Sequence, residues 1–342
     1  MRKLINFGII GFGKIGPRHR QKIEGNKYCN LKAICDIDTK RLDEVKDNNV
    51  QLYTAYKQML KNPEIDVVSI CTPNYLHAQM TIDALNAGKH VICEKPMALK
   101  TRDCEKMINT AIQNDRKLFI VKQNRYNPPV QAVRHLLDEN RLGKLFFAVL
   151  NCYWNRNKDY FASSTWKGNR EKDGGALFTQ FSHFIDLMYW FAGEVKSVYA
   201  FVKNYNHPAI DIEDTGIVAL KFKSCATGAI NFTNCAYEKN MEGSITLFGE
   251  KGTVKIGGEY LNKIEYQMIE NYKIPSLPRS KEANDYGTYK GSMSNHHKVY
   301  ENVVNVLLHN GDIAVGGVDG MQTVKILEAI YKSAESNREI FL

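Results

Sequence analysis

LINFGIIGFGKIG, residues 4–16, decides the fold of this chain. The first seven of these residues are mostly apolar and predict a strand, and the last six match G-x-G-x-x-G at the mouth of a helix. The three glycines permit a tight turn, close approach of the backbone to a pyrophosphate, and close packing of the helix on the strand. Free N–H groups at the start of the helix attract the same anion. The stretch predicts a dinucleotide site lined by Gly11, Phe12, Gly13, Lys14, Ile15 and Gly16.

The glycine motif alone also fits a purely structural turn, so its surroundings decide between the two interpretations. A second apolar run, Leu31–Cys35, ends at Asp36, about twenty residues beyond Gly16, where an acidic side chain can accept both ribose hydroxyls of a dinucleotide. A carboxylate there repels a 2′-phosphate, which favours NAD over NADP. Lys40 and Arg41 are near enough to weaken that preference.

Strands and helices keep alternating after Asp36. The expected strands are Ile65–Cys71, His90–Cys93 and Lys117–Val121, and the expected helices are Leu76–Ala87 and Arg102–Asn114. Alternation of this kind indicates a parallel sheet wound by right-handed crossovers. We therefore expect an α/β fold in which residues 1–124 form an NAD-binding Rossmann domain.

The pattern changes after residue 124, where a helix over Pro128–Leu142 is ended by Gly143. The expected strands that follow are Leu145–Tyr153, Val198–Val202, Gly216–Phe222, Ala226–Cys235, Gly243–Phe248, Thr253–Ile256 and Tyr260–Met268. Such a succession is typical of a mostly antiparallel sheet. Residues 275–291 predict a long loop, and two helices, Asn295–His309 and Met321–Ser336, close the chain. We expect residues 125–342 to form a substrate-binding and oligomerisation α+β domain with an open sheet. Because an open face needs covering, we expect a homodimer or homotetramer.

Composition narrows the class of protein. Of the 342 residues, 44% are hydrophobic and 24% are charged, which is ordinary for a globular enzyme. No apolar run approaches the roughly twenty residues that span a bilayer, and a strand begins too early for a signal peptide, so we expect no membrane association. The eight cysteines form no C-x-x-C pair, which predicts a reducing cytoplasm without disulfides or zinc. The net charge of +9 is dispersed, so we expect no nucleic acid. A generally basic surface and a site for anionic small molecules both remain open.

Polar residues that can carry catalysis occur at two places. Lys95 emerges at the end of the strand His90–Cys93. Thr179, His183 and Asp186 share one face of an expected helix over Ala176–Trp190. A histidine on such a helix is often a hydrogen-bonded core residue, but a nicotinamide fold and a nearby strand-end lysine favour catalysis. His183 can take a hydroxyl proton, and Lys95 can stabilise the alkoxide and keep the histidine neutral. The two roles can be exchanged.

The chain resembles the Gfo/Idh/MocA oxidoreductases over essentially its whole length. The resemblance rests on the glycine motif, on residues 71–74 (CTPN) with His77, on residues 88–96 (GKHVICEKP), and on Gly174-Gly175 followed by His183 and Asp186. It implies an NAD-dependent oxidation of a secondary alcohol, with Lys95 and His183 as the catalytic residues. The further cofactor-binding residues that it implies are Thr72, Pro73, Asn74, His77, Glu94, Lys95 and Gln123.

Within the family, residues 122–128 (KQNRYNP), 153–157 (YWNRN) and 173–180 (DGGALFTQ) look like the branch that oxidises UDP-N-acetyl-2-amino-2-deoxyglucuronate at C3. Members of that branch supply 3-keto sugars to an aminotransferase in surface-polysaccharide synthesis. Many other members have an aspartate where this chain has Thr179, which argues against inositol or glucose. The substrate-binding residues expected on this basis are Lys95, Asn124, Arg125, Tyr126, Trp166, Lys167, Arg170, Thr179, Gln180, His183, His296 and Tyr300.

Three alternatives to this interpretation concern a metal site, another sugar substrate and a non-catalytic sensor. His296, His297 and Tyr300 begin a helix beside the long loop, but no carboxylate or cysteine cluster lies near them in sequence, so we expect no metal. Another sugar, such as a free polyol, an amino sugar or a glycoside, is the second enzymatic interpretation. A non-catalytic sensor of NAD(P) or sugar is the third, although binding alone does not need both Lys95 and His183.

Overall fold

The computed structural model describes residues 4–45, 47–278, 282–287 and 289–342 and divides the chain into two compact units. The first unit comprises Met1–Lys122 and His296–Val324, and the second comprises Gln123–Asn295 and Lys325–Leu342. This division differs from the expected single boundary after residue 124. The reason is that the helix α10 (His296–His309) packs on α1 (Gly16–Glu24) and so belongs with the first unit.

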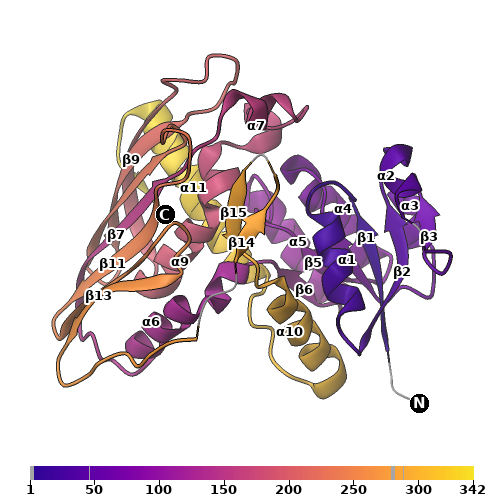
Figure 1. Ribbon diagram of the computed structural model, residues 1–342, viewed down its shortest axis with the longest axis horizontal. Coiled ribbons are helices and arrows are strands. Elements are labelled where there is room, and N and C mark those ends of the chain that lie inside the picture. Colours follow the sequence, from indigo (N-terminus) through magenta and orange to yellow (C-terminus); the bar gives the residue numbers. More distant parts are fainter. Residues whose placement is uncertain (1–3, 46, 279–281, 288) are drawn as a thin grey trace. The chain divides into compact units, whose positions relative to one another are not determined.

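The first unit is built on a six-stranded sheet in the order β3-β2-β1-β4-β5-β6, in which all neighbours are parallel (Figure 1). Its strands are β1 (Ile5–Ile10), β2 (Cys29–Cys35), β3 (Gln51–Tyr53), β4 (Val67–Ile70), β5 (His90–Cys93) and β6 (Leu118–Ile120). The carboxyl ends of parallel strands meet at one edge, and the strand order reverses between β1 and β4. Ligands of doubly wound sheets bind at such a point. The predicted Rossmann fold is thereby confirmed.

Helices connect these strands. They are α1, α2 (Thr39–Asp43), α3 (Tyr56–Leu60), α4 (His77–Asn86, after the 3₁₀ turn Asn74–Leu76) and α5 (Thr101–Gln113), and α10 comes from a later part of the chain and packs on α1. The predicted strands and helices of this unit lie within a few residues of the observed ones. The sequence did not reveal β3, α2 and α3, because elements of three to five residues are too short to show a periodicity.

The second unit holds an eight-stranded sheet in the order β13-β12-β11-β7-β10-β9-β8-β16, in which β7 and β10 are parallel and all other neighbours antiparallel. Its strands are β7 (Leu145–Tyr153), β8 (Val195–Lys203), β9 (Thr215–Phe222), β10 (Thr227–Thr233), β11 (Glu242–Gly249), β12 (Gly252–Gly257), β13 (Lys263–Ile269) and β16 (Ile340–Phe341). The predicted open, mostly antiparallel sheet is confirmed.

Helices cover one face of this sheet. They are α6 (Pro128–Asp138, after the 3₁₀ turn Gln123–Tyr126), α7 (Lys158–Ala162), α8 (Arg170–Asp173), α9 (Ser182–Ala192) and the later part of α11 (Gly317–Ser336). Figure 1 shows α9 and α11 on the same side of the strands. On the opposite face Phe147, Phe201, Ile217 and Phe248 are exposed. In the described ranges, no helix is both long and apolar enough to cross a membrane.

Three predicted elements of the second unit differ from the structure. The expected helix Ala176–Trp190 is a π-helical turn, Leu177–Phe181, followed by α9. The helix from Pro128 ends at Asp138, because Asn140 adopts a positive φ of 53° that stops it before Gly143. The long loop 275–291 contains most of a hairpin of β14 (Ala283–Asp285) and β15 (Lys290–Met293), while residues 279–281 and 288 of that loop lie outside the described ranges.

Candidate functional site

The glycine-rich turn of the first unit leaves room for backbone and ligand only. Gly11 has a φ of 93°, and a Cβ there would lie 2.7 Å from the backbone of Cys71 at the end of β4. A Cβ at Gly16 would lie 2.4 Å from the Gly11 carbonyl oxygen. At Gly13 an added Cβ would meet the Arg41 guanidinium at 3.3 Å. The first and third glycines are therefore required by packing, and the second keeps an open approach between the turn and Arg41.

Asp36 lies directly beside this turn. Its Oδ2 accepts a hydrogen bond from the Phe12 N–H at 2.6 Å, and its Oδ1 accepts one from the Asp38 N–H at 2.9 Å. Arg41 Nη1 lies 3.3 Å from the same Oδ2. The carboxylate is thus pinned next to the glycine turn, where ribose hydroxyls can reach it. Arg41 reduces the net negative charge at that position.

The loop after β4 also carries a polar group that suits a ligand. The Thr72 hydroxyl is buried and has no hydrogen-bond partner in the described part of the chain. His77 bridges two loops, with Nδ1 2.7 Å from the Pro96 carbonyl oxygen and Nε2 2.9 Å from the Thr72 carbonyl oxygen. A buried hydroxyl without a partner costs free energy unless a bound molecule satisfies it. The glycine cradle, Asp36 and Thr72 together fit NAD.

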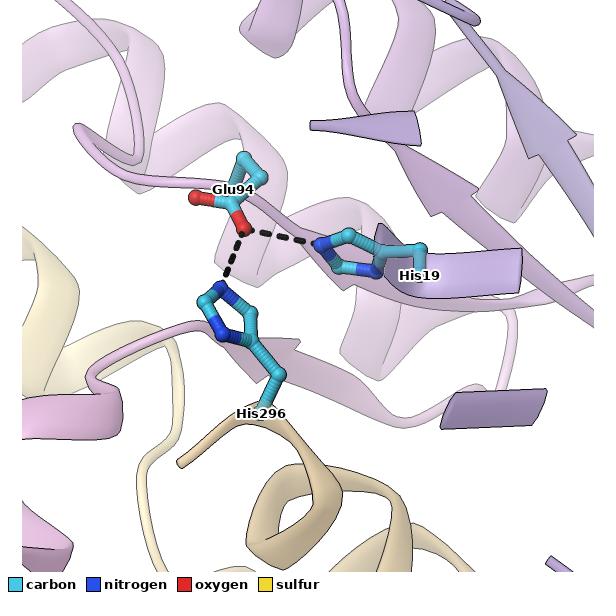
Figure 2. Close-up of side chains that lie close together, drawn as sticks. All are labelled: His19, Glu94 and His296. Carbon is cyan, nitrogen blue, oxygen red and sulfur yellow. Dashed lines mark hydrogen bonds and ion pairs between the residues drawn. The ribbon is translucent and has the colours of Figure 1, made fainter. Parts of the chain in front are cut away.

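Lys95 follows β5 and is half-buried, and its peptide bond to Pro96 is cis. The neighbouring Glu94 is buried and faces His19 and His296 (Figure 2). Its Oε1 lies 2.8 Å from His19 Nε2 and 3.4 Å from His296 Nε2, and its Oε2 accepts from the Lys95 N–H at 3.1 Å. Burial acts to raise the pKa of Glu94, but the neighbouring His19 and His296 imidazoles hold it well below its usual range.

In the second unit, His183 lies in the first turn of α9, directly after the π-helical turn. The His183 side chain is 2% exposed, and its Nε2 lies 3.1 Å from Gln123 Nε2. An amide N–H donating along this line needs a ring nitrogen that carries no proton, so the contact favours neutral His183. π-helical turns occur often at functional sites because they reorient the side chains that follow.

A buried ion pair holds α9 against the turn that carries Gln123. Arg125 donates from Nε and Nη2 to the two carboxylate oxygens of Asp186, both at 2.8 Å. The Arg125 guanidinium also stacks 4.9 Å from the ring centre of Trp190. Bidentate geometry of this kind is strong and directional. The pair therefore fixes the position of His183 relative to Gln123.

A second buried carboxylate holds the start of the same helical segment. Glu213 Oε1 accepts from the Ala176 N–H at 2.8 Å and from the Tyr331 hydroxyl at 2.6 Å. Tyr331 also lies against Gly175, where a Cβ would be 2.1 Å from its hydroxyl oxygen. Gly175 has a φ of 127°, so glycine is required there both by conformation and by space. Burial raises the pKa of Glu213 to about 7.

Family models match most of the chain. The model described as the NAD-binding Rossmann fold of the Gfo/Idh/MocA oxidoreductase family matches residues 5–122, and the model of the C-terminal α/β domain of that family matches residues 134–342. The chain belongs to this family. It is an NAD-dependent dehydrogenase that acts on a secondary alcohol.

Two similar solved structures and one curated relative cover the whole length of the chain. The WlbA dehydrogenase of Bordetella pertussis, in complex with NADH and UDP-GlcNAcA, is 33% identical with a TM-score of 0.88 over 99% of each chain. The WlbA dehydrogenase of Chromobacterium violaceum, in complex with the same two molecules, is 32% identical with a TM-score of 0.89 over 100% of this chain and 96% of that chain. The myo-inositol 2-dehydrogenase of Thermotoga maritima is 26% identical over 99% of this chain and 98% of its own length.

Several residues expected to contact the sugar or the cofactor of this Gfo/Idh/MocA protein are engaged elsewhere. The Arg125 guanidinium is committed to Asp186. Gln180 accepts from Arg156 Nε at 2.9 Å through Oε1 and donates to the Tyr160 hydroxyl at 2.6 Å through Nε2. Both are buried, so neither has a side-chain group directed at a substrate.

Three further residues expected at the site have partners inside the first unit. Tyr300 is fully buried, and its hydroxyl lies 2.7 Å from His19 Nδ1 and 3.0 Å from Ser69 Oγ. The carboxylate that the sequence around His296 lacks is supplied by Glu94, 202 positions away, because the first residue of α10 faces the residue that follows β5. Glu94 likewise uses both carboxylate oxygens within the unit instead of offering them to the cofactor.

Other expected residues remain placed for a site. Asn124 is 1% exposed, and neither of its side-chain polar atoms has a hydrogen-bond partner among the described residues. Gln123 Oε1 is in the same situation. The Lys167 ammonium lies over the Tyr160 ring, with Nζ 3.9 Å from the ring centre. Tyr126, Trp166 and Thr179 are partly buried, Thr179 donates to Asp173, and Arg170 is half-exposed and pairs with Glu335 at 2.8 Å.

Four other buried residues with polar contacts were not among the residues expected at the site: His19, Arg156, Glu213 and Tyr331. His19 stands three residues after the last glycine of the turn, which places it on the buried side of α1. This position could have identified His19 from the sequence as a buried polar residue. Glu213 and Tyr331 stand 118 residues apart and meet only through the fold. Arg156, buried among Trp154 and Tyr160, carries no local mark that separates it from a surface arginine.

Proposed function

We propose that this Gfo/Idh/MocA dehydrogenase oxidises the C3 hydroxyl of UDP-N-acetyl-2-amino-2-deoxy-D-glucuronate (UDP-GlcNAcA) to the 3-keto sugar, with NAD⁺ as the acceptor. The observation that carries the proposal is the likeness to two WlbA dehydrogenases at 32–33% identity over nearly the whole chain, each crystallised with this nucleotide sugar. The product would feed the synthesis of surface polysaccharide in the cytoplasm.

The reaction divides between the cofactor and two side chains. Oxidation removes a hydride from C3 and a proton from its hydroxyl, and bound NAD⁺ supplies the hydride acceptor. His183 takes the hydroxyl proton, a role that suits a histidine because an ordinary imidazole changes its charge near neutral pH. Lys95, as an ammonium ion, stabilises the developing alkoxide. In the alternative assignment, Lys95 is the base and His183 the hydrogen-bond donor.

Buried polar atoms of the second unit support a polar substrate. Gln123 Oε1 and both side-chain atoms of Asn124 lack partners among the described residues, and such groups are stabilised when a ligand bonds to them. The net charge of +9 favours a substrate with a carboxylate and a diphosphate. Lys167 and Arg170 are the cations proposed to hold those anions, while Arg125 is withdrawn from that role.

The second candidate is a neutral polyol. The full-length likeness to a myo-inositol 2-dehydrogenase favours it, at 26% identity. Thr179, where many members have an aspartate, argues against it, and the Thr179 hydroxyl is engaged with Asp173. A site arranged for a carboxylate discriminates strongly against a substrate that lacks it, because the cation is then left unpaired.

Ketone formation followed by mass spectrometry distinguishes the candidates. The purified protein is incubated with NAD⁺ and, separately, UDP-GlcNAcA, UDP-N-acetylglucosamine, myo-inositol and glucose. We expect kcat/KM for the uronate to exceed that for the neutral sugars by at least about a hundredfold. Turnover of a neutral polyol without turnover of the uronate would refute the substrate and leave the family intact. Binding of NAD and nucleotide sugar without any turnover would instead indicate a sensor.

We also infer that the exposed sheet face of the second unit is covered in a homodimer or homotetramer. Phe147 and Phe248 stack there with ring centres 6.0 Å apart, and Phe201 is 59% exposed. Large exposed apolar areas usually mark an interface. Sedimentation analysis tests this: Phe248→Lys should yield smaller species than the wild type, and a wild-type monomer at micromolar concentration would contradict it.

A further inference from the structure

Three buried side chains meet at the carboxyl edge of the first unit, and all three belong to that unit. His19 comes from α1, Glu94 from the end of β5, and His296 is the first residue of α10. Their exposed fractions are 1%, 7% and 1%. Figure 2 shows both imidazole rings directed at one oxygen of the Glu94 carboxylate. None of these three side chains takes part in the reaction proposed above, although Glu94 is adjacent to Lys95 in sequence.

Hydrogen bonds alone account for the contacts of His19. A neutral His19 donates its Nε2–H to Glu94 Oε1 at 2.8 Å and accepts the Tyr300 O–H on Nδ1 at 2.7 Å. Ser69 then donates to the Tyr300 oxygen at 3.0 Å. Each polar group in this chain of hydrogen bonds finds a partner, as buried groups require.

His296 is bound less tightly. Its Nε2 lies 3.4 Å from Glu94 Oε1, and neither ring nitrogen has a partner of hydrogen-bond geometry among the described residues. Burial lowers the pKa of His296, Glu94 acts to raise it, and His19 and Arg18 on α1 act to lower it. The charged or titratable groups that act on His296 thus come from α1 and from the end of β5.

The three donor atoms lie within 4.8 Å of one another, a spacing that a metal ion could also occupy. The 2.8 Å contact between His19 and Glu94 already has the length of a charge-assisted hydrogen bond. The second nitrogen of His19 is held by Tyr300 and the second oxygen of Glu94 by the Lys95 N–H. Hydrogen bonds therefore account for the contacts of His19 and Glu94, whereas His296 makes only the longer 3.4 Å contact.

The arrangement around Lys95 gives the cluster a role. Glu94 Oε2 accepts from the Lys95 N–H at 3.1 Å, and on the other side the Pro96 carbonyl oxygen lies 2.7 Å from His77 Nδ1. Lys95 thus projects from a backbone segment whose two flanking residues are each held by buried histidines. Those histidines stand on three different helices, α1, α4 and α10.

We propose that Glu94 is a positioning residue for Lys95, and that His19 and His296 hold its carboxylate so that the lysine ammonium points at the reacting alcohol. This inference rests on the proposed catalytic role of Lys95. The negative charge of Glu94, one residue away, also favours the charged form of Lys95. Misplacement of a catalytic group by about 1 Å can cost a hundredfold in rate, so a fixed backbone here matters to turnover.

Glu94→Gln tests the inference, because the amide keeps the size of the side chain and removes its charge. We expect kcat to fall by about ten- to a hundredfold, whereas KM and NAD affinity change by less than about threefold. His296→Gln, which leaves Glu94 charged, should cause a smaller loss and should change the acidic limb of the pH–rate profile. His135→Gln is the matched control, because His135 forms an exposed pair with Glu139 at 3.2 Å on α6 and should behave as the wild type.

A second readout needs no substrate. The rate at which an amine-reactive anhydride labels Lys95 is measured against pH by peptide mass spectrometry. Loss of the Glu94 charge should lower the labelling midpoint of Lys95 by about half to one pH unit. Wild-type kcat and an unshifted midpoint in folded Glu94→Gln would overturn the inference. If that variant does not fold, a wild-type pH–rate profile in His296→Gln would overturn it.

The outcomes separate this inference from the substrate assignment. A shifted Lys95 midpoint together with no turnover of UDP-GlcNAcA by the wild type supports positioning and refutes the substrate. If the wild type and Glu94→Gln turn over UDP-GlcNAcA equally well, the substrate is supported and positioning is refuted. One transition-metal ion per chain in the wild type, absent from His296→Gln, would replace the hydrogen-bonded cluster by a metal centre and refute the inference.

Discussion

Two buried glutamates, one in each unit, support the segments that carry the two catalytic candidates, and their surroundings shift their pKa values in opposite directions. Glu94 adjoins Lys95, and two imidazoles hold its pKa well below the usual range despite burial. Glu213 holds the start of the segment that leads to His183, and burial raises its pKa to about 7. Its Oε1 has a tyrosine hydroxyl and a backbone N–H as donors, but its Oε2 has no partner among the described residues. The difference shows that the donors, more than the depth, decide whether a buried carboxylate is ionised.

The largest effect comes from removing the two residues that these carboxylates support. Lys95→Ala and His183→Ala should each lower turnover by orders of magnitude while NAD still binds, because each removes a group that acts on the reacting hydroxyl. If the two act as one unit, the double variant is scarcely worse than either single one. Stopped-flow turnover and NAD titration check this. Near-wild-type turnover in either single variant would remove that residue from the chemistry.

Asp186 is a third buried carboxylate, and it forms a bidentate ion pair with Arg125. Arg125→Met leaves Asp186, 1% exposed, without its bidentate partner. Breaking such a pair by removing one partner costs about 3–5 kcal/mol of unfolding free energy. Urea unfolding measures it, with Arg102→Met as the control, because Arg102 is exposed and its ion pair with Asp103 on α5 lies at the surface. Equal losses of unfolding free energy in the two variants would show that the buried ion pair contributes no more to stability than the exposed one.

The raised pKa of Glu213 predicts a pH dependence of stability. Its pKa rises from an ordinary 4.5 to about 7 on folding, so between these values the unfolded chain releases a proton that the folded chain retains. The contribution of Glu213 to stability is therefore complete below about pH 4.5 and is lost as the pH rises towards 7, by an amount on the order of 3 kcal/mol. Glu213→Gln should abolish this slope in urea unfolding at pH 5 and pH 8. Glu335→Gln, at an exposed carboxylate paired with Arg170, should keep it. An unchanged slope in Glu213→Gln would show that Glu213 is ionised.

The smallest effect concerns Asp36, a carboxylate held by backbone N–H groups and Arg41. Asp36→Ser should weaken NAD by about 1–2 kcal/mol and NADP by less, because the lost charge repels the 2′-phosphate. Fluorescence titration with both cofactors measures the difference. Equal losses for the two would exclude Asp36 from the choice of cofactor.

Most of the first unit could be predicted because its strands and helices alternate along a continuous stretch of chain. The glycine turn, the strand-end position of Asp36 and the start of β5 at His90 all follow from local pattern. Helix α10 could not be assigned to this unit, because its contacts with α1 join residues far apart in sequence, as between His19 and Tyr300, which are 281 positions apart. The π-helical turn before His183 was equally hidden, since its residues also fit an ordinary apolar helix.

The sequence by itself determined the fold class, the glycines that the cofactor turn needs, the acidic strand end and the family, because each depends on residue type at short spacing. The tertiary structure alone decided which charges are paired. Arg125 and Gln180 look like substrate ligands in sequence, yet Asp186, Arg156 and Tyr160 occupy them. His296 looks like part of a sugar site, yet it faces Glu94. Electrostatic partners are set by distances in space between residues far apart in the chain, and no local pattern encodes those distances.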